Sequence, residues 1–342
     1  MTTAFKMLYT LPRMRKVIIF GAGGLIGMNL CRSLSSVGME IIPTARSNRY
    51  HSFYESLGLK FEIIDITDRK DFNKLPESGV DVVVLAAAYL PAAMKGYHPE
   101  QYIENNTLGA LNVLEYCRRA HVKQIIYFQS HSDVSGHWGN GLIDPYTPKS
   151  VNYNNDHSVY VISKIAAEEL IKHYHAAYGL SYCVLRCPNI YAWQPREFYY
   201  YNGEKKYIAY RKLIRQAINS EPIEIWGNCK VKRDMVYIKD LEQLVIKSIE
   251  KEVDSSIYNV STGEGTTLEE EIKAIVRVFC PSNSPSPIIY RPEISVIESN
   301  HRYSIDNAVK EIGYEPQFDC EAMFRDMKKE MDSHFWDFIK DE

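Results

Sequence analysis

The chain has 342 residues, of which 45% are hydrophobic and 24% charged, and its formal net charge is -3 at pH 7. This composition is typical of a globular protein with room for one domain and a smaller lobe, and the acidic excess argues against a nucleic-acid partner. No apolar run reaches the roughly 20 residues that span a bilayer, so we expect no membrane partner. The 7 cysteines, an odd number without zinc-site spacing, predict neither disulfides nor a metal and favour a cytoplasmic location.

Strand-like and helix-like segments alternate after an N-terminal extension, residues 1–14. Apolar and β-branched runs predict strands at 16–20, 39–45, 60–66, 81–88, 123–128 and 180–188. Apolar residues at helical spacing predict helices at 24–38, 105–122 and 158–179. This order predicts an α/β fold of the Rossmann type over residues 15–190, with a doubly wound parallel sheet covered by helices on both faces.

The alternation weakens in the second half of the chain. Residues 191–342 are expected to form mainly a smaller C-terminal substrate-binding lobe, with excursions back to the sheet. Residues 191–211 are aromatic and charged and are interpreted as a loop-rich insertion, and 280–293 as a connector rich in Pro and Ser. The remaining predictions are helices at 211–219, 268–279 and 305–313 and a strand at 223–226.

A glycine-rich turn follows the first predicted strand, in the segment "VIIFGAGGLIG". Glycines there allow a tight turn and a close approach of the backbone to a pyrophosphate, and the free N–H groups at the start of the next helix face the anion. Three glycines alone are weak evidence, but their place between strand and helix predicts dinucleotide binding. The predicted contacts are Gly21, Gly23, Gly24, Leu25, Ile26 and Gly27.

The end of the second predicted strand indicates which dinucleotide binds. NAD-binding chains usually place an acid there for the ribose hydroxyls, whereas this chain has Ala45 followed by Arg46. A guanidinium pairs with a 2′-phosphate, so we predict NADP, with NAD as the alternative. The competing interpretation is that Arg46 is an ordinary surface residue. Asp65, at the end of the third strand, is expected to bond the adenine amino group or to cap the following turn.

The segment "YVISK" places Tyr160 and Lys164 four residues apart on one helix, so both project from the same face. A phenol has a pKa near 10, and a neighbouring ammonium stabilises the phenolate and lowers that value toward the working range. Such spacings also arise by chance among 25 tyrosines. The upstream glycine motif favours the catalytic interpretation.

Six segments follow one another in order: "GAGGLIG", "LAAA", "NTLGALN" with Asn106, "YVISK", "LRCPNIY" and "RDMVYIKD". Together they resemble the extended short-chain dehydrogenase/reductases, which include nucleotide-sugar epimerases, dehydratases and 4-keto-sugar reductases. The resemblance covers roughly residues 15–330. It implies that Tyr160 is the acid–base residue and that Lys164 tunes it and binds the cofactor ribose. The further cofactor contacts that we expect are Ile66, Ala86, Ala87, Ala88, Asn106 and Pro188.

The same resemblance implies a site for the nucleotide diphosphate of the sugar. Asn189 and Arg233 occupy the matching positions, and Arg291 is a further candidate for the same anion. Guanidinium is the better phosphate ligand. The alternative for Arg233 is an ion pair with Asp234 or Asp240.

The segment "YFQSHSDVSG" departs from the family pattern. Family members typically have Ser or Thr five residues before its final glycine, bonding the sugar hydroxyl and the catalytic tyrosine. Counting back from Gly136 gives His131, with Ser130 and Ser132 on either side. Either His131 takes the role, since an imidazole donates a hydrogen bond and trades a proton near neutral pH, or a bulge moves Ser132 into place. We favour His131, and expect Ser130 to bind substrate.

These features predict an NAD(P)-dependent enzyme that transfers a hydride at a carbon, expected to be C4, of a nucleotide sugar. Asp133 is followed by Val134 rather than by the Glu of the family's dehydratases, so dehydration is disfavoured. The predicted NADP preference favours a 4-keto-sugar reductase over an epimerase that recycles NAD. There are three alternatives: a nucleotide-sugar 4-epimerase that recycles NAD, an enzyme acting on a non-nucleotide carbonyl compound, and a non-catalytic NADP(H)-binding sensor. A homodimer through the helices of Asn106 and Tyr160 is expected.

Overall fold

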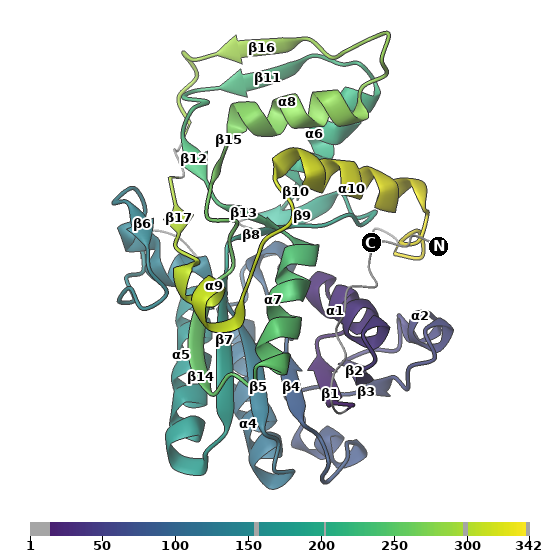
Figure 1. Ribbon diagram of the computed structural model, residues 1–342, viewed down its shortest axis with the longest axis vertical. Coiled ribbons are helices and arrows are strands. Elements are labelled where there is room, and N and C mark those ends of the chain that lie inside the picture. Colours follow the sequence, from purple (N-terminus) through teal and green to yellow (C-terminus); the bar gives the residue numbers. More distant parts are fainter. Residues whose placement is uncertain (1–13, 154–156, 202, 297–299, 340–342) are drawn as a thin grey trace.

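The computed structural model describes residues 14–153, 157–201, 203–296 and 300–339. Its centre is a seven-stranded sheet in the order β14-β7-β5-β4-β1-β2-β3, in which all neighbouring strands are parallel (Figure 1). The Rossmann-type prediction is confirmed. The extension predicted at 1–14 lies outside the described residues except for Met14. The strands are β1 (Lys16–Phe20), β2 (Glu40–Ala45), β3 (Glu62–Ile63), β4 (Val82–Leu85), β5 (Gln124–Ser130), β7 (Ser181–Cys187) and β14 (Ser255–Asn259).

Helices cover both faces of this sheet. In β1, Val17 and Ile19 face one hydrophobic core and Ile18 and Phe20 face the other, because successive side chains of a strand point to opposite faces. The first core includes residues of α1 (Leu25–Ser36) and α7 (Ile238–Glu250). The second includes residues of α4 (Ala110–Arg119) and α5 (His157–Tyr178). The buried strands therefore show continuous apolar runs rather than alternation.

Two predicted elements of this half differ in the structure. The strand predicted at 60–66 pairs only over β3, because Asp65 leaves the sheet and accepts hydrogen bonds from Thr67. The helix predicted at 105–122 is divided into a π-helical segment, η3 (Ile103–Gly109), and α4. The π-helical turn carries Asn106, whose buried amide bonds the backbone of Tyr89 instead of facing solvent. The short elements here are α2 (His51–Ser56), η1 (Arg69–Lys74), η2 (Pro91–Ala93), α3 (Pro99–Tyr102) and η4 (His131–His137).

The second half of the chain forms a lobe beyond the carboxyl ends of the sheet strands, at the top of Figure 1. Its helices are α6 (Ala209–Ile218), α8 (Leu268–Phe279) and α10 (Cys320–Asp332), whereas α9 (Asp306–Ile312) packs against α7 and β14 of the main sheet. Its strands form two-stranded sheets: β8 (Asn189–Tyr191) with β13 (Met235–Tyr237), β9 (Phe198–Tyr201) with β10 (Glu204–Tyr207), β11 (Ile223–Trp226) with β16 (Ile288–Arg291), and β12 (Lys232–Arg233) with β15 (Thr266–Thr267). A further pair joins β6 (Leu142–Ile143), from the first half of the chain, to β17 (Arg302–Tyr303). Both α7 and β14 return from this half of the chain to the main sheet.

Sequence patterns predicted this lobe less completely. The helix expected at 268–279 is α8, and its start is fixed by reciprocal hydrogen bonds between Thr267 and Glu270. The supposed insertion 191–211 instead contains the β9–β10 hairpin, and the supposed connector 280–293 contains β16. The sequence interpretation missed α10, which packs against α8.

Two further observations concern the predictions made from composition, on membrane spans and on disulfides. None of the helices in the described part of the chain combines the length and the apolar character needed to cross a bilayer. The seven cysteines all lie among the described residues, and each is a free thiol.

Candidate active site

The glycine turn between β1 and α1 is shaped by the backbone. Gly21 has a φ of 88°, and a methyl group there would lie 2.4 Å from the backbone nitrogen of Ala87. A methyl group on Gly27 would lie 2.3 Å from the carbonyl oxygen of Gly21. No side chain caps α1 at Gly24, so the first backbone N–H groups are left for an anion. This cradle fits the pyrophosphate of a nicotinamide dinucleotide, with Gly23, Leu25 and Ile26 in the same turn.

Other predicted cofactor contacts surround this turn. Ala86 donates its N–H to the carbonyl of Phe20, which places the run Ala86–Ala88 beside the glycines. Arg46 is exposed directly after β2, with its guanidinium 6.0 Å from the ring centre of Tyr89. The carboxylate of Asp65 instead accepts bonds from the N–H and hydroxyl of Thr67, at 2.9 and 2.7 Å. Of the two roles expected for Asp65, the structure therefore shows the capping of the turn.

Ile66 and Pro188 are predicted cofactor contacts with buried positions. The carbonyl of Ile66 accepts a bond from Asn112 at 2.9 Å, and the Ile66 side chain lies against Gly109. Pro188 joins β7 to β8, directly after Cys187. Both positions follow the carboxyl ends of sheet strands, where ligands bind in open α/β sheets.

Tyr160 and Lys164 lie one turn apart on α5, as their spacing predicted. The pKa of Tyr160 is not lowered by Lys164 as expected: burial raises it above its ordinary value, and the Ser130 hydroxyl acts in the opposite direction. Burial lowers the pKa of Lys164 to about 7, although Cys187 and Glu168 oppose this shift. Cys187 influences both groups, so all three lie together at the end of β7.

Helix α5 is held in register under these two residues. The ammonium of Lys164 lies 4.1 Å from the ring centre of Tyr127, whose hydroxyl donates to the Lys164 carbonyl at 3.0 Å. Asn106 donates to the hydroxyl of Ser163 at 3.0 Å, and Ser163 donates to the carbonyl of Tyr160 at 2.7 Å. Asn106 therefore joins the hydrogen-bond chain of the tyrosine, with Ser163 as a member that the sequence interpretation missed.

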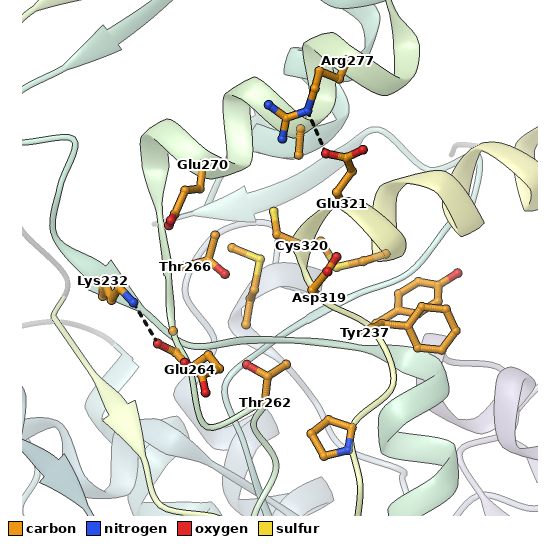
Figure 2. Close-up of a pocket in the computed structure, with 16 residues that line it drawn as sticks. Lys232, Tyr237, Thr262, Glu264, Thr266, Glu270, Arg277, Asp319, Cys320 and Glu321 are labelled. Atoms are coloured by element: carbon orange, nitrogen blue, oxygen red, sulfur yellow. Dashed lines mark hydrogen bonds and ion pairs between the residues drawn. The ribbon is translucent and has the colours of Figure 1, made fainter.

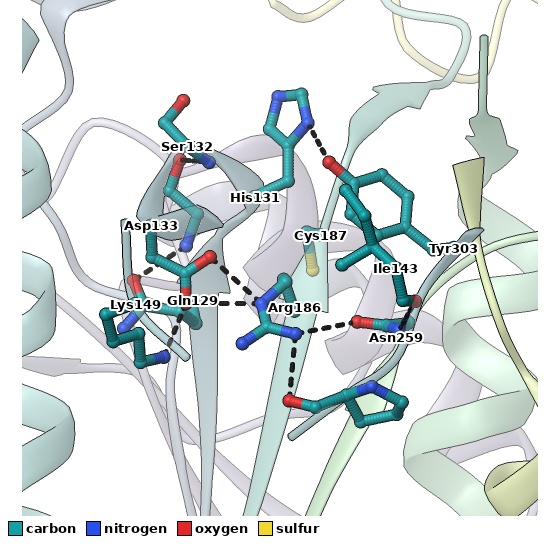
Figure 3. Close-up of polar contacts among 12 residues, drawn as sticks. Gln129, His131, Ser132, Asp133, Ile143, Lys149, Arg186, Cys187, Asn259 and Tyr303 are labelled. Atoms are coloured by element: carbon teal, nitrogen blue, oxygen red, sulfur yellow. Dashed lines mark hydrogen bonds and ion pairs between the residues drawn. The ribbon is translucent and has the colours of Figure 1, made fainter. Parts of the chain in front are cut away.

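The segment after β5 places its polar residues differently from the expectation. Of Ser130, His131 and Ser132, only Ser130 has a hydroxyl that acts on Tyr160, where it lowers the pKa of the phenol against the larger effect of burial. The backbone N–H of Ser132 donates to the Ser130 hydroxyl at 3.3 Å. His131 turns toward β17, and its Nδ1 lies 3.0 Å from the hydroxyl of Tyr303 (Figure 3). The position that matches the family's Ser or Thr is therefore filled by a side chain facing another part of the site.

We had expected His131 to exchange a proton near neutral pH, but its surroundings act against this. Burial, together with the neighbouring His301 and Arg186, lowers the pKa of His131 to about 3. The neutral form of the ring is therefore favoured near neutral pH.

A buried network of charges lies below this segment (Figure 3). Asp133, fully buried, accepts from Arg186 at 2.9 Å and from Lys149 at 2.5 Å. Lys149 also contacts Glu168 at 2.6 Å, and Glu168 accepts from Gln129 at 2.7 Å. The network ties together η4, β5, β7 and α5, whose ends carry Ser130 and Tyr160. Contacting residues of the network are up to 53 positions apart in the chain, so no local sequence motif predicts it.

Of the predicted diphosphate ligands, Asn189 lies near Arg233, since it pairs with Met235, and Arg291 lies apart from both. Arg233, on β12, is paired at 2.7 Å with the buried Glu271, not with Asp234 or Asp240 as the alternative had it. Asn189 is exposed at the start of β8. Arg291 lies on β16, in the outer part of the lobe (Figure 1), where it pairs with Glu224 at 3.3 Å.

A cavity of about 520 Å³ lies in the lobe between β12 and the starts of α8 and α10 (Figure 2). Lys232, Glu270 and Asp319 are among the residues lining it, and none of the predicted catalytic or cofactor residues is. This cavity is therefore distinct from the arrangement around Tyr160.

Comparison with known proteins places this geometry in a family. A family model described as "NAD dependent epimerase/dehydratase family" matches residues 17–261. UDP-glucuronate 4-epimerase 1 of Arabidopsis thaliana is 25% identical over 346 residues, covering 90% of this chain and 74% of the relative.

Solved structures agree in fold. UDP-glucose 4-epimerase of Thermotoga maritima, with UDP-glucose, has a TM-score of 0.75 and 20% identity over 93% of this chain and 99% of its own. UDP-glucuronic acid 4-epimerase of Bacillus cereus, in complex with NAD, has a TM-score of 0.71 and 20% identity over 91% of this chain and 94% of its own. The chain therefore belongs to the NAD-dependent epimerase/dehydratase family of extended short-chain dehydrogenase/reductase enzymes.

Proposed function

We propose that this enzyme interconverts the two configurations at C4 of a nucleotide-linked sugar. The observation that carries the proposal is the arrangement of Tyr160, which shares one face of α5 with Lys164 and is close enough to Ser130 for that hydroxyl to lower its pKa. All three lie at the carboxyl edge of the parallel sheet, beside the glycine turn. This is the edge where a dinucleotide and a second substrate meet in such folds.

The chemistry follows from the residues at that edge. Oxidation of a secondary alcohol removes a hydride from carbon and a proton from oxygen. A bound nicotinamide dinucleotide would accept the hydride and return it. Tyr160 would take the proton from the hydroxyl as phenolate and give it back as phenol. Lys164, as a cation, and Ser130, as a hydrogen-bond donor, would stabilise the phenolate form.

The relatives favour epimerisation as the outcome, since those named above are 4-epimerases. A second candidate, the net reduction of a 4-keto sugar, is favoured by the end of β2. Ala45 stands there without an acid, and Arg46 is exposed beside it. A guanidinium at this place supports binding of the 2′-phosphate of NADP(H), which is consumed in reduction.

The nucleotide diphosphate would bind at Arg233. Its guanidinium is partly exposed, while Glu271 holds one Nη nitrogen from the buried side and also accepts from Tyr191 at 2.9 Å. A guanidinium carries five N–H donors in a planar fork, so a single carboxylate contact leaves others for a phosphate. Asn189 would add a neutral contact.

A homodimer would form through η3 and α5. Ile103, Leu108 and Ile162 are 39, 51 and 43% exposed on these two elements, which pack against each other. Apolar side chains are more frequent at the centres of homodimer interfaces than on the remaining surface. Light scattering after gel filtration should give the mass of a dimer for the parent protein and a lower mass for Leu108→Glu. A monomeric parent would contradict the dimer.

The reaction is tested with purified enzyme, NAD or NADP, and a panel of UDP-glucose, UDP-N-acetylglucosamine, UDP-glucuronate and dTDP-glucose. Proton NMR should show the C4 epimer of at least one sugar, with no net change in cofactor absorbance. Stoichiometric loss of NADPH with a 4-keto nucleotide sugar would instead identify the reductase. Failure of every sugar to react with either cofactor would contradict both candidates.

A further inference from the structure

Four rings gather where the family's Ser or Thr would stand, and we call His131, Trp138, His301 and Tyr303 the ring cluster. The ring centres of His131, Trp138 and His301 lie 4.9–5.0 Å from one another. Tyr303 stands at their side, 6.0 Å from His131 and 5.8 Å from His301. His301 and Tyr303 are buried, whereas His131 and Trp138 are partly exposed. The surface that the cluster presents therefore comes from His131 and Trp138.

Hydrogen bonding within the ring cluster fixes the proton of His131. The indole N–H of Trp138, which can only donate, donates to the hydroxyl of Tyr303 at 3.1 Å. The same hydroxyl lies 3.0 Å from Nδ1 of His131. In the described part of the chain, no other acceptor for the phenol proton is within hydrogen-bonding distance. Tyr303 therefore donates to Nδ1, and the neutral imidazole keeps its proton on Nε2.

The free donor points away from Tyr303. In Figure 3 the His131 ring stands above the end of β5, with Nδ1 toward Tyr303 and the other nitrogen on the side of the ring away from Tyr303. The lowered pKa of His131 favours the neutral ring, in which this nitrogen is an uncharged donor.

The ring cluster lies between the two ends of the proposed substrate site. His131 directly follows Ser130, whose hydroxyl lowers the pKa of Tyr160. At the other side, the N–H of Asp234, next to Arg233, donates to the carbonyl of His301 at 2.9 Å. In the proposed function the sugar would lie between the acid–base centre and the diphosphate ligand, beside the ring cluster.

We propose that His131 is a specificity-determining residue, whose Nε2–H donates to an uncharged oxygen of the sugar while Trp138 packs against the sugar ring. The inference rests on the proposed function. It selects neutral sugars over uronic acids, because the arginines around the ring cluster are directed elsewhere. The side chain of Arg302 lies against Gly265, and the free N–H donors of Arg233 would bind the diphosphate. Arg186 contacts Asp133, and Arg233 contacts Glu271. A sugar carboxylate would thus meet a neutral donor and no uncommitted guanidinium from these arginines.

The tautomer can be measured without any substrate. Long-range ¹H–¹⁵N spectra of protein labelled with ¹⁵N-histidine, assigned through His131→Gln, should show Nε2 protonated and Nδ1 not. Tyr303→Phe removes the donor to Nδ1 and should give a mixture of both tautomers. A proton on Nδ1 in the parent protein would overturn the inference at this step.

The contact with the sugar is measured by titration of UDP, dTDP, UDP-glucose and UDP-glucuronate into the enzyme saturated with NAD. His131→Ala should weaken UDP-glucose about 10-fold, the effect of one lost hydrogen bond, and leave UDP unchanged. His131→Gln, which keeps an amide donor, should recover part of the loss. UDP-glucose should bind more tightly than UDP-glucuronate.

The outcomes separate the inference from the proposed function. If His131→Ala weakens UDP as much as UDP-glucose, or weakens neither, His131 does not contact the sugar. If UDP-glucuronate binds the parent protein as tightly as UDP-glucose, the selectivity is wrong. If neither UDP nor dTDP binds, the proposed nucleotide substrate is wrong, while the tautomer measurement still decides the state of His131.

Discussion

The two ends of the candidate site are built from different materials. The cofactor end consists of backbone and small side chains: Gly21, Gly27 and the Ala86–Ala88 run, held at distances that leave no room for a methyl group. The substrate end consists of buried charges and stacked rings, among them Asp133 with Arg186, Arg233 with Glu271, and the ring cluster. Substitutions at the cofactor end should therefore be harmful because atoms overlap, and substitutions at the substrate end because a buried charge loses its partner.

The largest effect is expected from Asp133→Asn. The change leaves Arg186 and Lys149 without their shared carboxylate in a buried place, and breaking a buried pair typically costs about 3–5 kcal/mol. Urea unfolding should show a loss of this order. The control is Glu204→Gln, which removes a solvent-exposed pair with Lys206 and should change stability by less than about 1 kcal/mol. Equal losses for the two variants would contradict the distinction between the network and a surface pair.

Arg233→Ala tests the same end through binding. A lost charge-assisted hydrogen bond costs about 1.5–3 kcal/mol, so UDP affinity should fall about 10- to 100-fold. NAD affinity should be unchanged, since Arg233 is not at the glycine turn. Calorimetric titration measures both. Arg291→Ala is the matched control and should have a smaller effect, because Arg291 pairs with Glu224 in the outer lobe. A larger loss of UDP affinity in Arg291→Ala would contradict the assignment of Arg233 as the diphosphate ligand and favour Arg291 instead.

At the cofactor end, Gly27→Ala should destabilise the fold by about 1–3 kcal/mol, the usual cost of forcing atoms into a packed place. Its methyl group would lie 2.3 Å from the Gly21 carbonyl oxygen, whereas one on Gly23 would meet Ala45 at an ordinary 3.5 Å. Thermal unfolding should therefore separate Gly27→Ala from Gly23→Ala. Indistinguishable melting temperatures would show that α1 can move away from the turn.

The smallest effect is a pH dependence at the substrate end. The pKa of His131 is lowered from 6.5 to about 3 by burial, then by His301 and Arg186, so the unfolded chain binds more protons between these values. Stability is thus full above about pH 6.5 and falls as the pH drops toward 3. His131→Gln should reduce the loss between pH 6.5 and 5 by about 1–2 kcal/mol. A steeper loss in the variant would contradict the assigned pKa direction.

Sequence analysis predicted the two ends unequally, for a physical reason. The glycine turn and the Tyr160–Lys164 pair depend on residues within one or two turns of each other, so spacing alone reveals them. Tyr303 lies 172 positions from His131, and Glu271 lies 38 positions from Arg233. Only the folded chain brings such partners together. Ser130 was not recognised as the residue that acts on Tyr160 for a different reason. Counting back from Gly136 assumes a regular backbone through η4, which the structure does not have at Val134.

The central claim is that Tyr160 moves the proton while a hydride leaves and returns at a sugar carbon. It is tested most directly by single-turnover absorbance at 340 nm, with the reactive sugar of the panel and the oxidised cofactor. The parent enzyme should form reduced cofactor transiently. Tyr160→Phe, with cofactor affinity unchanged, should form it at least about 100-fold more slowly. Formation of reduced cofactor at the parental rate in Tyr160→Phe would contradict the account.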